Sequence, residues 1–336
     1  MIIPKHYENL KVLREGAMPP RAYFIPASKR MEGLVENRES SDRIQMLTGK
    51  WKFRYFKSIY DLEEAFFDKT FNASGYDEIS VPGVWQTAGY DRHQYTNIRY
   101  PFPFDPPYVP ADNPCGAYIH EFDYKKDEAA PKAFLNFEGV DSCFYVWLNG
   151  NYIGYSQVSH CTSEFDVSRM LLEGKNKLAV LVLKWCDGSY LEDQDKFRMS
   201  GIFRDVYLIK RPQQAVRDYF VKTALNEGKA QVSVSIHYFD EGVPGVAALY
   251  DRDNKKAAES TFGKTPAKTE NIVMEISDPV LWNTEDPYLY TLVLETEGET
   301  ITDHVGIREI RIKDKVVYFN GEKIKFRGVN RHDSDP

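Results

Sequence analysis

The chain has 336 residues, 42% of them apolar and 28% charged, which is the balance of a folded globular protein and predicts about two or three domains. The 14% aromatic content excludes a disordered chain, and the net charge of −7 predicts no nucleic-acid partner, because such partners favour basic surfaces. Apolar runs such as Leu178–Leu183 are far shorter than the ~20 residues of a membrane span, so no membrane partner is expected.

The N-terminal sequence and the cysteines indicate a compartment. The start of the chain lacks a basic segment followed by roughly 7–15 apolar residues, so no signal peptide is expected. Cys115, Cys143, Cys161 and Cys186 form no Cys-x-x-Cys pair and predict no zinc site. In a chain of this length they are expected to be free thiols in a reducing compartment, which predicts a cytoplasmic protein.

Residues 1–50 predict an extended N-terminal arm. They carry four prolines and a charged stretch from Lys29 to Arg43, so they should gain their order by packing on another part of the protein. Directly after the arm, Ser58–Phe67 shows helical periodicity, with Ser58 as the N-cap, and this is the best helix candidate in the chain.

Residues 51–212 are dominated by period-two alternation, which predicts β-strands. Asn149 and Gly150 separate two of these strands and predict a two-residue hairpin turn, because both central positions of such a turn need positive φ. The alternating segments are Lys132–Phe137, Phe144–Leu148, Tyr152–Tyr155, Lys177–Trp185 and Val206–Lys210. Many short strands with few helices predict a mainly β protein built on a sandwich.

A second series of short strands starts near Arg211 and Pro212 and predicts a sandwich of immunoglobulin-like size over residues 213–314, closing with Val305–Ile312. Residues 315–336 do not fit that sandwich. They contain a hairpin around Asn320 and Gly321, and then an apolar stretch around Phe326 that predicts a buried strand. We therefore expect a further domain to begin here without being completed.

Four carboxylates fall within nine residues of one aromatic-rich segment, at Asp187, Glu192, Asp193 and Asp195. Two interpretations are open. The segment is a solvated acidic loop, or it is a site in which buried carboxylates are compensated by Arg198, Arg204 or a bound cation.

Aromatic residues, amides and prolines also alternate from Val84 to Pro101. This composition suits a wall that stacks rings on a sugar and bonds its hydroxyls through amides, but an aromatic edge of the core would have the same composition.

Together these segments resemble the large lactose-cleaving β-galactosidases of glycoside hydrolase family 2. The matching strings, in family order, are VPGVWQ (81–86), YTNIRYP (95–101), PPYVPADNPCG (106–116), SEFDVS (163–168), DGSYLEDQDKFRMSGIFRDV (187–206), PVLWNTEDPYLY (279–290) and FRGVNRHDSDP (326–336). The resemblance implies a jelly-roll domain over 51–212, an immunoglobulin-like sandwich over 213–314 and the first strand of a truncated TIM barrel within 315–336. It implies hydrolysis of terminal β-D-galactosides such as lactose with retention. The combination of the DGSYLEDQD and YTN strings separates the chain from β-glucuronidase-like members, which are the alternative.

The resemblance also implies site residues. Asn97 resembles a residue that bonds sugar hydroxyls, Asp195 one that meets the galactose 6-hydroxyl and ligates sodium, and His332 a barrel-top residue that donates to the sugar. Both catalytic glutamates and the magnesium ligands of the family lie beyond the matching strings. The complete protein is therefore expected to use magnesium and sodium and to form a homo-oligomer, whereas this chain alone should bind metal weakly and be inactive.

An alternative from another class is a non-catalytic carbohydrate-binding or adaptor module, because jelly rolls bind sugars in unrelated proteins. Affinity separates the two hypotheses. Part of a galactosidase pocket should bind galactose with a Kd weaker than about 1 mM, whereas a complete module should bind more tightly.

Overall fold

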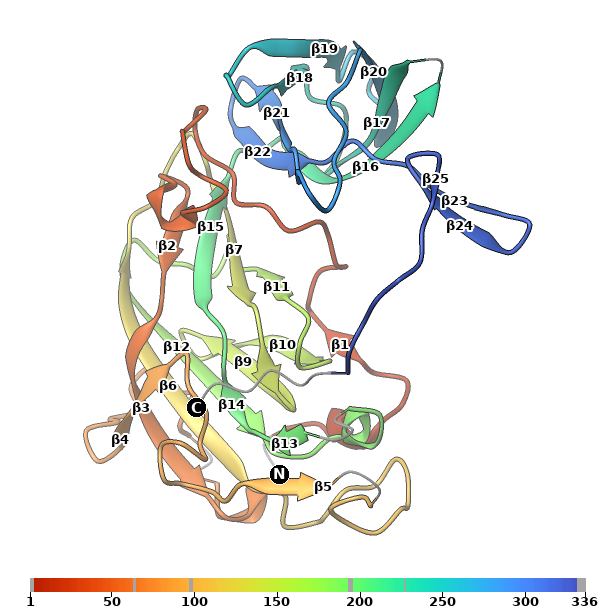
Figure 1. Cartoon of the computed structure of the whole chain (residues 1–336). Helices are drawn as coiled ribbons and strands as arrows, with labels where there is room; N and C mark the ends of the chain where they lie inside the picture. The colour runs from red at the N-terminus through yellow and green to blue at the C-terminus, as the bar shows by residue number, and fades with distance from the viewer. Residues whose placement is uncertain (1–2, 63–64, 97–98, 193–195, 227, 331–336) are drawn as a thin grey trace. The chain divides into compact units, whose positions relative to one another are not determined.

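The computed structural model describes residues 3–62, 65–96, 99–192, 196–226 and 228–330. The chain divides into two compact units (Figure 1). The first contains Met1–Pro20 and Gln45–Lys210, and the second contains Arg21–Ile44 and Arg211–Pro336. Both units consist of antiparallel β-sheet, in agreement with the predicted mainly β, two-sandwich fold.

The first unit is built on two sheets. The larger has the order β1-β10-β9-β12-β6-β3-β4 and the smaller the order β11-β7-β15-β2. The strands of the larger sheet are β1 (Arg14–Glu15), β3 (Gly49–Phe56), β4 (Asp77–Val81), β6 (Cys115–Tyr124), β9 (Cys143–Leu148), β10 (Asn151–Gln157) and β12 (Gly174–Leu183). Those of the smaller sheet are β2 (Ile44–Met46), β7 (Lys132–Phe137), β11 (Ser163–Asp166) and β15 (Val206–Arg211).

The predicted hairpin joins β9 to β10. Asn149 and Gly150 have φ values of 53° and 83°, and Asn151 pairs with Leu148 across the turn. Positive φ at both positions is the geometry that Asn-Gly favours, so this prediction is confirmed.

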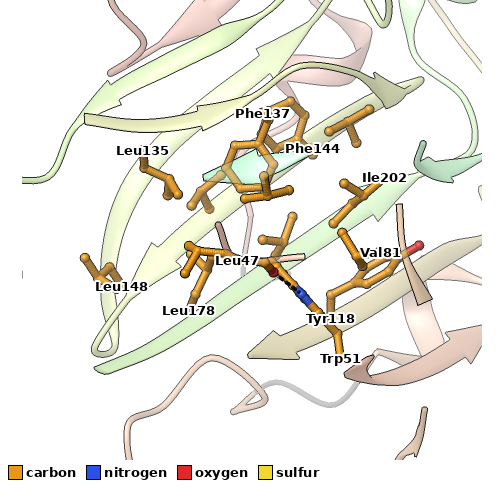
Figure 2. Packing of buried hydrophobic residues seen from close by; sticks show 14 of the residues in the cluster. Leu47, Trp51, Val81, Tyr118, Leu135, Phe137, Phe144, Leu148, Leu178 and Ile202 are labelled. Carbon is orange, nitrogen blue, oxygen red and sulfur yellow. Dashed lines mark hydrogen bonds between the residues drawn. The ribbon is translucent and has the colours of Figure 1, made fainter. Parts of the chain in front are cut away.

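Strand β12 explains why the chain contains an unbroken apolar run. Leu178, Val180 and Val182 enter the core between the two sheets, which Figure 2 shows from close by. There the Trp51 Nε1 donates to the Leu47 carbonyl at 2.7 Å. The alternate residues of β12, such as Leu181, face a second apolar cluster on the other side of the sheet. A strand buried on both faces needs apolar residues at every position.

Gly116 on β6 shows how closely this core is packed. A Cβ there would lie 2.5 Å from Phe53 Cε2 and 2.8 Å from Trp85 Cζ2, and both rings are buried. We expect Gly116→Ala to lower the free energy of unfolding by about 1–3 kcal/mol through overpacking. Gly75→Ala, where a Cβ would meet nothing within 4 Å, is the matched control in urea denaturation. Equal stability of the two variants would contradict the prediction.

The N-terminal arm divides between the units. In the first unit, Arg14 and Glu15 form β1 on the edge of β10, and the Tyr145 hydroxyl donates to the Pro4 carbonyl at 2.6 Å. In the second unit, Ala27 forms an isolated bridge with Thr300. Backbone pairing with two different partners thus orders the arm on either side of residue 20.

The prediction of a helix over Ser58–Phe67 is wrong. The described residues of this stretch contain only a 3-10 helix, η3 (Ile59–Asp61), and the chain returns to extended backbone at Leu62. The Ser58 side chain accepts from the Tyr60 N–H as the predicted cap. Leu62 and Phe66 are buried in the second apolar cluster, so tertiary packing satisfies them without a helix.

The second unit is a sandwich of a three-stranded sheet, β16-β17-β20, and a four-stranded sheet, β19-β18-β21-β22. The strands are β16 (Val216–Asn226), β17 (Lys229–Tyr238), β18 (Gly245–Tyr250), β19 (Lys256–Phe262), β20 (Thr269–Ser277), β21 (Tyr290–Thr296) and β22 (Thr300–Val305). Alternate residues such as Val232, Val234 and Leu292 fill its core. The alternation of apolar and polar residues in the sequence predicted this sandwich.

The end of the chain differs from the prediction. Ile310–Lys313 (β23) does not close the sandwich but pairs with β24 (Val316–Phe319), which continues into β25 (Glu322–Lys323) around the predicted Asn-Gly turn. The expected first barrel strand is absent from the described residues of this segment: residues 324–330 have no regular structure, and Phe326 and Val329 are largely exposed. A barrel strand needs backbone partners on its neighbours, and the described part of the chain offers it none.

Candidate functional site

A two-stranded ladder joins the two segments that the sequence singled out. In this ladder β5 (Gln94–Thr96) pairs with β13 (Lys196–Arg198), with Thr96 opposite Lys196 and Tyr95 opposite Phe197. The rings of Tyr95 and Phe197 lie 5.9 Å apart edge to face, and both are half exposed. Residues about one hundred positions apart in the sequence therefore form one edge of the first unit.

The three predicted sugar contacts, Asn97, Asp195 and His332, lie outside the described residues, as does Asp193. The described residues next to two of them are brought together, because Thr96 precedes Asn97 and Lys196 follows Asp195, and these two residues are directly opposite in the ladder. The convergence of the three predicted contacts stays a prediction.

Arg198 is the buried cation of the acidic segment. Its Nη2 donates to the backbone carbonyls of Ser189 and Glu192, each at 3.1 Å, and its guanidinium lies 5.5 Å from the Trp185 ring centroid. Arg204, the other candidate partner, is exposed and donates to the His160 carbonyl at 3.2 Å. Arg198 thus fixes the backbone of the acidic segment.

The first carboxylate of the segment is buried, which excludes a fully solvated loop. Asp187 opens the 3-10 helix η4 (Asp187–Tyr190), is 4% exposed, and accepts from the Gly188 N–H at 3.0 Å. Burial raises the pKa of Asp187, and hydrogen bonds from Gln157 and Gly188 offset only part of this effect. Further along, Glu192 Oε1 accepts from the Ser159 N–H at 2.9 Å.

At pH 7 we expect Asp187→Asn to raise the free energy of unfolding by about 1 kcal/mol, because a neutral amide removes the cost of a buried charge. Since the folded pKa is raised, the folded protein holds this proton more tightly than the unfolded chain, and wild-type stability falls as pH rises through the raised value. The advantage of asparagine should therefore vanish toward about pH 3, where the carboxyl is protonated in both states. Urea unfolding across this range, with the exposed Asp112→Asn as control, measures it; identical curves at pH 7 would contradict it.

A buried polar network supports the ladder from behind. Gln86 Oε1 accepts from the Ser200 N–H at 3.0 Å, while its Nε2 donates to Asp91 Oδ2 at 3.2 Å. The same Asp91 oxygen binds the Lys184 ammonium at 2.5 Å. Gln86 belongs to a string that the sequence singled out, whereas the pairing of Asp91 with Lys184 was not predicted. The sequence signal for a buried ion pair was Lys184, which stands between a buried apolar run and Trp185.

The described residues around the ladder enclose little space by themselves. Beside the ladder, a hollow of about 20 Å³ is lined by residues that include Ser159, His160, Glu192 and Phe197. This volume holds about one water-sized group, so a sugar would need further walls beyond those that the structure describes.

The aromatic segment divides between the two interpretations that the sequence left open. Trp85 is fully buried in the core and donates its Nε1 to the Tyr118 hydroxyl at 2.6 Å. Tyr95 and Tyr100 are exposed instead, as is Phe104 just after the segment. Trp85 therefore belongs to the core, and the exposed rings are the ones available for a ligand.

Within the described ranges, no group of three or more His, Cys, Asp or Glu side chains is arranged to hold a metal ion. Asp195, through which the resemblance implies sodium, lies outside these ranges. All four cysteines are free thiols, as predicted. No helix in the described part of the chain has the length and apolar character needed to cross a membrane.

Two family models match the two sandwiches. Residues 44–212 match the sugar binding domain of the glycosyl hydrolases family 2, and residues 214–308 match a second domain of glycosyl hydrolases family 2. This order of domains, a sandwich of the sugar-binding type followed by a second sandwich, defines the class of protein. The chain belongs to glycosyl hydrolase family 2.

Curated relatives and solved structures agree with this family. The chain is similar to the β-galactosidase of Actinobacillus pleuropneumoniae, with 46% identity over 339 residues that cover 100% of this chain and 32% of the relative. It is similar to the β-galactosidase of Staphylococcus xylosus, with 43% identity over 100% of this chain and 33% of the relative. The chain therefore spans about a third of the length of these relatives.

Among solved structures, a β-glucuronidase from an uncultured Clostridium has a TM-score of 0.67 and 24% identity, covering 86% of this chain and 49% of that one. The Ruminococcus gnavus β-glucuronidase has a TM-score of 0.66 and 20% identity, again over 86% of this chain and 49% of that one. At these identities the likeness shows the fold alone.

Proposed function

We propose that this chain is the N-terminal part of a β-galactosidase that hydrolyses terminal β-D-galactosides such as lactose with retention. Its first unit would supply one wall of the galactose pocket. The observation that carries the proposal is the ladder between β5 and β13, which pairs the neighbours of Asn97 and Asp195. The identity of 46% with a curated β-galactosidase over the whole chain supports it.

In this proposal the chain's own residues bind and orient the sugar. Asn97 bonds ring hydroxyls, and Asp195 bonds the 6-hydroxyl. Backbone pairing of β5 with β13, together with Gln86 and Arg198, holds the segments on which these residues lie. Rigid positioning of this kind lets binding energy act on the reacting bond instead of being lost in ordering the site.

Retaining glycosidases cleave with two carboxyl groups ~5–5.5 Å apart, one acting as nucleophile and the other as acid and base. The resemblance gives both roles to glutamates beyond this chain. The contact from His332, sodium at Asp195, magnesium in the longer protein, the homo-oligomer and the cytoplasmic location stay predictions.

The charges beside the ladder do not separate a galactoside from a glucuronide. Lys184 and Arg198 line the hollow together with Asp141 and Glu192, so two basic and two acidic side chains are balanced there. The identity of 46% with a curated β-galactosidase is what favours a galactoside over the β-glucuronidase-like alternative.

The test is turnover of nitrophenyl β-D-galactoside and nitrophenyl β-D-glucuronide by the longest product of the reading frame that contains these residues. The 336-residue chain is assayed beside it. We expect the long product to prefer the galactoside at least about tenfold in kcat/KM, and the chain alone to show no turnover. Preference for the glucuronide, or a reading frame that encodes no catalytic glutamates, would contradict the proposal.

A further inference from the structure

Val158 has a backbone conformation that its side chain disfavours. It directly follows β10, and its φ of 74° lies in the left-handed region. This region is uncommon for residues other than glycine, and a β-branched residue is strained there. The Val158 side chain is 44% exposed, so burial in the core does not explain the conformation. Backbone strain of this kind persists only where surrounding contacts hold the chain in place.

Backbone hydrogen bonds hold the turn over residues 158–161. The Cys161 N–H donates to the Val158 carbonyl at 3.0 Å and closes the turn. The Val140 N–H donates to the Ser159 carbonyl at 3.2 Å and ties the turn to a neighbouring segment of the first unit. The chain is therefore kept in the strained conformation directly after the last residue of β10.

The turn is connected to the acidic segment through Glu192. The N–H of Ser159, a residue that is 2% exposed, donates to Glu192 Oε1 at 2.9 Å. The backbone of Glu192 is held as well, because its N–H donates to the Gly188 carbonyl at 3.0 Å and its carbonyl accepts from Arg198 Nη2 at 3.1 Å. Glu192 is thus fixed through its side chain and through its backbone.

Glu192 is the last described residue before Asp195, and Lys196 is the first described residue after it. Lys196 is fixed by its pairing with Thr96 in the ladder. The short connection that carries Asp195 is therefore held at both ends. Fixing the ends of a short connection reduces the conformational entropy that is lost when a ligand binds to it.

We propose that Val158 is a positioning residue of the sugar site. Its left-handed turn directs the Ser159 N–H to Glu192 and so fixes the start of the connection that carries Asp195. The inference rests on the proposed function, in which Asp195 bonds the 6-hydroxyl of galactose. Val158 acts through Ser159 and Glu192 and needs no contact with the sugar.

The first test measures the strain at Val158. Val158→Gly should raise the urea midpoint of the first unit, because glycine adopts positive φ without a steric penalty. Val273→Gly is the matched control, since Val273 is 47% exposed and lies on β20. There glycine should lower the urea midpoint of the second unit, because glycine weakens a strand. A midpoint of Val158→Gly at or below that of wild type would overturn the proposal.

The second test measures positioning. Val158→Pro should break the turn, because proline fixes φ at about −65°. Glu192→Ala leaves the sequence of the turn intact and removes the acceptor of the Ser159 N–H. In both variants we expect faster amide hydrogen exchange in β13. In the longest product of the reading frame, both should lower kcat/KM for nitrophenyl β-D-galactoside about tenfold.

Glu192→Gln separates position from charge, because it keeps an acceptor oxygen and should restore most of the activity lost in Glu192→Ala. Turnover by the wild-type product tests the proposed function, whereas the ratio of variant to wild type tests the positioning role, so failures of the two are distinguishable. Unchanged exchange in β13 of Glu192→Ala would overturn the proposal, even where Val158→Pro does not fold. So would wild-type kcat/KM in Glu192→Ala, or equal losses in Glu192→Ala and Glu192→Gln.

Discussion

Replacing Glu299 with leucine is expected to lower the free energy of unfolding of the second unit by about 3–5 kcal/mol. Arg211 and Glu299 are each 1% exposed, and they are joined by two hydrogen bonds, Nε to Oε2 at 2.7 Å and Nη2 to Oε1 at 2.6 Å. The leucine variant leaves the guanidinium buried without its counter-charge. Desolvation of an uncompensated charge is the reason for the large effect.

Urea denaturation measures this loss through the fluorescence of Trp282, the tryptophan of the second unit. The double variant Arg211→Met with Glu299→Leu should recover much of the stability, because it removes both charges. Glu275→Ala is the control, since its pair with Lys229 is exposed and should contribute less than about 1 kcal/mol. A loss for Glu299→Leu no larger than that of the control would refute the buried-pair explanation.

Asp91→Ala is expected to cost the first unit about 3–5 kcal/mol, because Lys184 is only 7% exposed and would lose its counter-charge. The same change removes one of the two acceptors of Gln86 Nε2, the other being the Ser200 hydroxyl at 3.4 Å. Since Gln86 also accepts from the Ser200 N–H, the backbone next to β13 should loosen. Faster amide hydrogen exchange at Ser200 is therefore expected together with the loss of stability.

The matched control for this experiment is Glu78→Ala, which breaks the exposed pair between Lys52 and Glu78 and should cost no more than about 1 kcal/mol. Adding Lys184→Met to Asp91→Ala should restore part of the stability. Unchanged exchange at Ser200 in the destabilised variant would show that the network does not support the ladder.

The parts of the fold that local chemistry determines could be predicted from the sequence. Asn149 and Gly150 favour positive φ at two successive positions, so their hairpin follows from two residues alone. The strand Lys132–Phe137 was predicted with the bounds that the structure gives to β7. Alternation and turn residues are properties of a short window, and no distant partner is needed to recognise them.

The parts that depend on distant partners could not be predicted. Ala27 bridges to Thr300, and Arg211 pairs with Glu299, yet nothing near either residue in the sequence indicates the partner. Ser58–Phe67 carries a helical pattern, but Leu62 and Phe66 are buried in a cluster with residues from distant strands. The expected barrel strand after residue 323 lacked neighbours among the described residues.

The candidate site shows the same division. Composition singled out both segments that form the ladder, because acids and aromatics are concentrated in them. The network behind the ladder was missed, since Asp91 and Lys184 are ordinary charged residues until the fold buries them together. Their importance comes from burial, which a single sequence does not show.

Titration of the ¹⁵N-labelled chain with galactose tests the central claim, that the β5–β13 ladder frames a sugar site, most directly. We predict shifts at the backbone amides of Thr96 and Lys196 with a Kd weaker than about 1 mM, and their loss in Asp195→Asn. Silence of these amides up to about 100 mM galactose, or unchanged shifts in Asp195→Asn, would contradict the claim. Micromolar binding would instead identify a complete carbohydrate-binding module.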